Sequence, residues 1–81
     1  MSTLEESWPA VLEGVRSRLR KQQFDTWFRH VTPSALTEDV LELEVPNGFS
    51  KDWLANHYFD VIADAAASVM GKRPEITFVV R

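Results

Sequence analysis

The stretch EVPNGFSKDWLANHYFDVI, residues 44–62, decides the fold, because a strand pattern passes directly into a helix pattern within it. The run VLELEV alternates apolar and acidic residues, which predicts a strand with one buried and one solvated face. Asn47 can accept N–H groups of a first helical turn, and the apolar spacing predicts a helix over about residues 48–70. Gly71 and then Pro74 end that helix. We therefore expect a half-buried strand followed at once by a long helix.

Phe49 lies in the first turn of this helix and faces away from its apolar stripe. On a helical wheel it lies about 170° from the centre of the stripe, and Trp53 lies beside it at about 130°. Two interpretations stay open: Phe49 packs under the hairpin or against another helix, or it is an exposed aromatic anchor for a protein partner. Trp53 is expected at the edge of the core. The stripe itself, which predicts the core face, contains Leu54, Tyr58, Val61, Ile62, Ala65 and Val69.

Apolar residues at helical spacing predict two helices ahead of the strand, over residues 8–20 and 22–30. Pro9 suits the first turn of the first helix, and Ser7 suits its N-cap. Gly14 is placed on the polar side of that helix.

Residues 31–36 predict a weak strand that forms a hairpin with the strand at 40–45, and residues 75–80 predict a closing strand. The order helix, helix, strand, strand, helix, strand indicates an α+β fold with a three-stranded sheet packed on helices, and an antiparallel sheet is expected. A chain of 81 residues is long enough for a single domain over residues 1–81, with an ordered core of about 7–80.

Composition excludes several classes of function. The chain has no cysteine and only three glycines, and it contains neither a phosphate-binding loop nor a nucleophile motif, so we expect no enzyme and no cofactor. A net charge of −3 disfavours nucleic-acid binding as the main task. The absence of cysteine fits a reducing compartment, so a cytoplasmic location is expected. No apolar run could span a membrane, and no signal peptide is recognisable.

The polar clusters give weaker indications. His30 and His57 have no metal-ligand spacing and are expected on the surface, and no metal site is predicted. Asp60 and Asp64 lie one helical turn apart and could bind a cation, although a solvated acidic face is the favoured interpretation.

One basic cluster, within residues 16–23, spans the end of the first predicted helix. It is expected to be a solvated face, with weak contact to a nucleic-acid backbone as the alternative. Its members are Arg16, Arg18, Arg20 and Lys21.

Trp8 lies on the apolar stripe of the first helix, at its open end beside Pro9. A core position and a contact with a second copy of the chain both stay open for this residue.

These motifs together resemble a known family. The spacing W-x-x-x-L, then F-x-x-W-F-R, then L-x-L-x-V-P-N-x-F-x-x-D-W-L-x-x-x-Y, is similar to that of the N-terminal domain of the bacterial replication initiator DnaA, from about residue 7 to 80. The resemblance implies a compact α+β fold like a type II KH domain, without the Gly-x-x-Gly loop of RNA-binding members. It implies a protein-interaction module that self-associates at the origin, recruits the replicative helicase and docks regulators of initiation. ATP would bind only in a separate ATPase domain.

The resemblance also assigns roles to residues. Trp8, with Leu12 on the same stripe, matches the self-association contact of the first helix. Phe49 matches the helicase-binding phenylalanine.

Asn47 and Trp27 match positions that contact regulators. Gln23 stands where some members carry a helicase-contacting glutamate, so the charge is absent here and a hydrogen bond is the contact still open to this residue. The alternative function is a KH-like domain that binds single-stranded nucleic acid.

Overall fold

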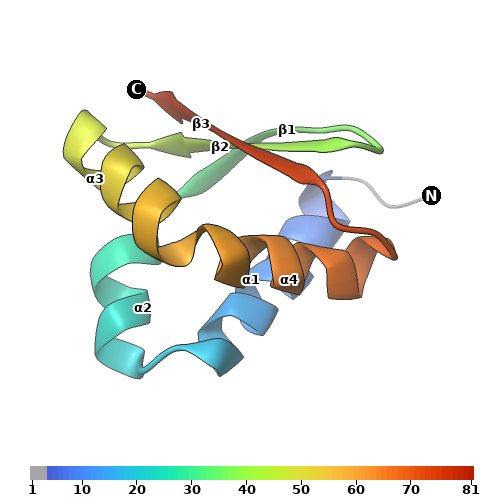
Figure 1. Ribbon diagram of the computed structural model, residues 1–81, viewed down its shortest axis with the longest axis horizontal. Helices are drawn as coiled ribbons and strands as arrows, with labels where there is room; N and C mark the ends of the chain where they lie inside the picture. Colours follow the sequence, from blue (N-terminus) through green and yellow to red (C-terminus); the bar gives the residue numbers. More distant parts are fainter. Residues whose placement is uncertain (1–3) are drawn as a thin grey trace.

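The computed structural model describes residues 4–81 and confirms the predicted α+β order (Figure 1). The likeness to a type II KH domain stays a prediction. The elements are α1 Leu4–Arg18, α2 Lys21–Phe28, β1 Thr32–Leu36, β2 Val40–Val45, α3 Gly48–Trp53, a π-helical turn η1 Leu54–Tyr58, α4 Phe59–Met70 and β3 Glu75–Val80.

The three strands form a mixed sheet in the order β1-β2-β3. β1 and β2 form the expected antiparallel hairpin, whereas β2 and β3 run parallel, with Leu43 opposite Phe78. The expectation of an antiparallel sheet was therefore wrong for β3. The reason is the connection: a helical crossover returns the chain to the end of the sheet where β2 began, so the next strand starts in the same direction.

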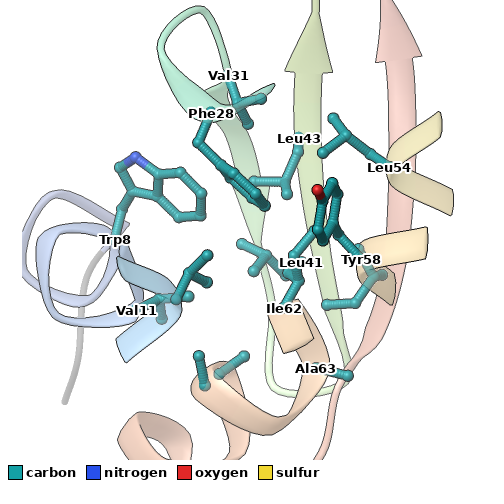
Figure 2. Close-up of a cluster of buried hydrophobic side chains, with 14 of the residues drawn as sticks. Trp8, Val11, Phe28, Val31, Leu41, Leu43, Leu54, Tyr58, Ile62 and Ala63 are labelled. Carbon is teal, nitrogen blue, oxygen red and sulfur yellow. The ribbon is translucent and has the colours of Figure 1, made fainter. Parts of the chain in front are cut away.

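The core lies between the sheet and the helices, which cover one of its faces (Figures 1 and 2). The alternation in β2 is confirmed, since Leu41, Leu43 and Val45 are buried and the intervening glutamates are only partly covered. The remaining core residues come from every helical segment except α3, and from β3 and the loop before β1: Trp8, Val11, Val15, Phe28, Val31, Leu54, Tyr58, Ile62, Ala63, Ala65, Ala66 and Ile76.

The first helix begins earlier than the sequence suggested. Because α1 starts at Leu4, Pro9 lies inside it and Ser7 is not its N-cap. Ser7 is instead buried, and its hydroxyl finds no hydrogen-bond partner within residues 4–81. The buried face of α1 consists of Trp8, Val11 and Val15, whereas the predicted stripe residue Leu12 is only half-buried.

Gly14 is not on a polar face, which corrects the expectation from the sequence. A Cβ added at this position would lie 3.1 Å from the Cβ of Ala65 on α4. Gly14 therefore permits the close approach of α1 and α4 that places both helices under the sheet.

The long helix is also interrupted. One helix was expected over residues 48–70, but the π-helical turn η1 divides it into α3 and α4. A π turn holds more residues than an α turn, so the face presented to the core shifts after it. Ala63 and Ala66 consequently join the core, while Val61 and Val69, placed on the stripe by the wheel, are half-buried.

The end of α4 is as predicted. Gly71 has the left-handed φ of 85°, and its N–H donates to the carbonyl of Ala67 at 2.9 Å.

Candidate functional site

Four ring side chains from α2, α3 and η1 lie in contact at the surface, and we call them the aromatic cluster: Trp27, Phe49, Trp53 and His57. The rings of Trp27 and Trp53 stack with centroids 4.8 Å apart and planes 11° apart. Phe49 lies 5.7 Å from the Trp27 ring and 6.1 Å from the Trp53 ring. At the other end, the imidazole of His57 lies 4.2 Å from the Trp53 ring. The cluster therefore ties α2 to the segment that follows β2.

Exposure differs sharply within the cluster. Trp27 and Trp53 are half-buried, which confirms the expected core-edge position of Trp53. Phe49 is 67% exposed, the largest exposure among the large apolar side chains of residues 6–81, and the outward orientation read from the wheel is confirmed. Its ring nevertheless contacts the Trp27 ring of α2, so one side of the Phe49 ring packs on an apolar surface and only the other side faces solvent.

The positions of Phe49 and Trp53 depend on how α3 begins. Asn47 is the N-cap, as predicted, and its side-chain oxygen accepts a hydrogen bond from the Ser50 N–H at 2.8 Å. Extended backbone at Asn47 turns the chain from β2 directly into the helix, with φ −162° and ψ 172°. Since Asn47 is itself exposed, the side-chain NH₂ group remains open to a partner beside Phe49.

Gln23 lies one helical turn before Trp27 on the same face of α2. Its side-chain oxygen accepts a hydrogen bond from the backbone N–H of Arg20 at 3.0 Å, which holds the start of α2. A glutamate at this position could accept the same bond, so glutamine preserves the local structure and removes only the charge.

Within the predicted interaction surface, α2 thus supplies Gln23 and Trp27, and the start of α3 supplies Asn47 and Phe49. Sequence reasoning missed two members of the cluster, because Trp53 was assigned only to the core edge and His57 only to the surface. The available signal was their spacing, since Phe49, Trp53 and His57 follow one another at four-residue intervals.

Trp8 and Leu12, the predicted self-association residues, lie on α1 outside the aromatic cluster. Trp8 is only 8% exposed and belongs to the core. Leu12 is half-buried and lines an open groove of about 450 Å³ between α1 and α2, whose other walls are Phe24, Asp25, Phe28 and Arg29.

The basic cluster is only partly free. Arg16 forms an ion pair with Glu13, and the hydrogen bond that Arg16 donates lowers the pKa of the Glu13 carboxyl. Arg18 donates to the carbonyl of Gly14 at 2.9 Å. Within residues 6–81, Arg18, Arg20 and Lys21 form no ion pair, so they remain available to an anionic partner.

The two aspartates of α4 have a protein partner. Arg73 binds Asp60 at 2.6 Å and Asp64 at 2.5 Å, so the acidic pair ties the end of α4 to the following loop and is not an open cation site. No group of three or more potential metal ligands occurs among the residues that the structure describes. None of the helices over residues 4–81 is long and apolar enough to cross a membrane.

Comparison with known proteins agrees with this architecture. The family model of the DnaA N-terminal domain matches residues 5–68. A chromosomal replication initiator protein DnaA from Gloeobacter violaceus is 32% identical over 77 residues, which cover 95% of this chain and 17% of that protein. The chain thus spans less than a fifth of the length of this relative.

Proposed function

The chain belongs to the DnaA N-terminal domain family, and we propose that it acts as a protein-interaction module of a bacterial replication initiator. In this role it recruits the replicative helicase, docks regulators of initiation and self-associates. The single observation that carries the proposal is the exposed ring of Phe49 on the stacked indoles of Trp27 and Trp53.

The geometry of the aromatic cluster suits a protein partner. Interface anchors are typically aromatic side chains that become fully buried on binding, and a 67% exposed phenylalanine has a large area left to bury. The two indoles beneath it are already stacked, so little side-chain freedom is lost when a partner covers the cluster. An exposed ring held in this way is a preorganised contact.

Polar groups around the cluster provide specificity. Asn47 offers its side-chain NH₂ group at one side of Phe49, and Gln23 extends the surface along α2 toward the basic residues. A partner with an apolar pocket and hydrogen-bond acceptors at its rim fits this arrangement.

The substitution Phe49→Ala tests the proposal. Because the side chain is mostly exposed, its loss should leave the free energy of unfolding within about 1 kcal/mol of wild type, while binding to the replicative helicase of the same organism weakens by at least about 1 kcal/mol. Lys51→Ala, an exposed change on the same helix, is the matched control and should leave binding unchanged. Unchanged affinity of Phe49→Ala, measured by calorimetry, would contradict the proposal.

Weak binding of single-stranded DNA is a second candidate, supported by Arg18, Arg20 and Lys21, which form no ion pair with the side chains of residues 6–81. A fluorescence titration with a labelled oligonucleotide at two salt concentrations tests it. Affinity that falls steeply with salt and is lost in Lys21→Glu supports this function. Salt-independent binding, or none, rejects it.

A further inference from the structure

The two edges of the sheet differ in a way that the functions above do not use. On the β1 edge, Pro33 lacks a backbone donor, and the register shifts between Pro33 and Ala35. Both features prevent another strand from adding there. The β3 edge has neither feature, because Glu75–Val80 is paired with β2 in an unbroken register and contains no proline. β3 also carries two exposed apolar side chains, Val79 at 39% and Val80 at 43%.

Hydrogen bonds at the two ends of β3 show which backbone groups face β2. The N–H of Glu75 donates to the carbonyl of Asp39 at 2.7 Å, and the N–H of Arg81 donates to the carbonyl of Val45 at 3.0 Å. Between these bonds the register is continuous, so the N–H groups of the odd-numbered residues point toward β2.

The even-numbered residues therefore direct both backbone groups to the free edge. By this alternation their backbone groups do not bond to β2. Ile76, Phe78 and Val80 also form no backbone hydrogen bond to a turn, loop or helix cap in the described part of the chain. Their N–H and C=O groups form a short row of unpaired donors and acceptors, which is the template for strand addition.

We propose that the β3 edge pairs with the β3 edge of a second copy of this chain, joining two sheets into one continuous antiparallel sheet. Antiparallel pairing about a two-fold axis at Phe78 places Ile76 opposite Val80 of the second copy. The backbone N–H groups that are unpaired in the single chain then donate to the unpaired carbonyls of the second copy, and the reverse holds for the second copy. A two-fold arrangement needs one self-complementary surface, and this edge is one.

The charges at the ends of β3 favour a second copy of this chain, rather than an unrelated strand, as the partner of the β3 edge. In this register Glu75 faces Arg81 of the second copy, and the same pair recurs at the other end. Arg81 already contacts Glu44 at 2.6 Å, but it is 77% exposed and its guanidinium has donors for a second carboxylate. Opposite charges directly across an antiparallel pair stabilise it, whereas like charges oppose it.

Amide hydrogen exchange tests the pairing directly. At low protein concentration the N–H groups of Thr77 and Val79 should be protected, because they bond to β2, and those of Ile76, Phe78 and Val80 should exchange rapidly. Raising the concentration to about 1 mM, in the range of weak association, should protect the even-numbered groups in step with the mass measured by sedimentation. Absence of association, or association that leaves these groups in rapid exchange, would overturn the proposal.

Charge exchange provides the matched variants. Glu75→Arg and Arg81→Glu each place like charges at both ends of the paired strands, so each should weaken association by roughly three- to tenfold. The double variant should restore it, because opposite charges face each other again. Arg81→Glu removes the ion-pair partner of Glu44 within one chain, and it does so in the single and the double variant alike. Recovery of association in the double variant therefore reports the contact between copies. A double variant no better than the singles would contradict the pairing.

The β3 edge is independent of the α1 surface, by which we mean Trp8 and Leu12, the residues that the family resemblance assigns to self-association. Leu12→Ser alters the groove beside α1 and should leave the alternating exchange along β3 unchanged. If instead Leu12→Ser abolishes all association, and the even-numbered amides never become protected, only the α1 contact exists and the β3 proposal is rejected.

Discussion

Replacing Trp8 by alanine separates a core role of this residue from a contact role. Trp8 is 8% exposed, and its indole points from α1 toward Phe28 (Figure 2). Removing a buried tryptophan side chain costs about 3–5 kcal/mol, from lost burial and from the cavity left behind. A chain of 81 residues has a total stability of only about 4–12 kcal/mol. Trp8→Ala should therefore lose a large part of the stability of the fold.

Urea denaturation followed by circular dichroism measures this loss. The midpoint should fall strongly while the dependence on urea concentration stays unchanged, because the surface exposed on unfolding is nearly the same. Trp8→Phe, which keeps an apolar ring, is the matched control and should lose clearly less. A loss below about 1 kcal/mol for Trp8→Ala would refute the core assignment, because a buried large side chain cannot be removed so cheaply.

The consequence concerns self-association. If Trp8→Ala unfolds the chain, loss of a dimer in that variant says nothing about a contact surface. Leu12→Ser is the better probe of the α1 surface, since Leu12 is only half-buried and borders an open groove.

Asn47→Ala removes the side-chain cap of α3 and should lower the free energy of unfolding by about 1 kcal/mol, measured by thermal denaturation. Gly14→Val should cost about 1–3 kcal/mol by the same measurement, because the added atoms would press on Ala65 across the helix contact. The hydrogen bond from Arg16 lowers the pKa of the Glu13 carboxyl below its ordinary value of 4.5. The ion pair therefore stabilises α1 fully above pH 4.5, and this stabilisation is lost as the pH falls through the pKa of Glu13 in the folded chain. The difference in melting temperature between wild type and Arg16→Gln should therefore shrink below pH 4.5.

The sequence predicted the parts of the fold that depend on local pattern. The alternation in VLELEV gave the buried face of β2, Asn47 gave the start of α3, and Gly71 gave the end of α4. Each of these depends on neighbouring residues in the chain, so its physical cause is readable from a short window.

Features that depend on contacts between distant segments were missed. The place of Gly14 is determined by its contact with Ala65, which is 51 positions away in the sequence. The parallel pairing of β3 follows from the helical crossover that precedes it. The π-helical turn η1 has no residue pattern that distinguishes it from an α-helical turn in the sequence. Ser7 and Pro9 together are typical of a helix start, yet both are accommodated inside α1.

In the candidate site, too, the sequence predicted what depends on a single helix and missed what depends on contacts between helices. A helical wheel places Phe49 outward because the wheel uses only its own helix, and the structure confirms this. The stacking of Trp27 on Trp53 depends on how α2 lies against α3, so no single-helix pattern could reveal it.

The central claim is that the surface formed by α2 and the start of α3 binds the replicative helicase. An amide NMR titration of this chain with the replicative helicase of the same organism tests it most directly. We expect shifts concentrated at Gln23, Trp27, Asn47 and Phe49, and clearly smaller shifts at the same helicase concentration with Phe49→Ala. Absence of shifts at saturating helicase, or shifts concentrated on α1 and β3, would contradict the claim.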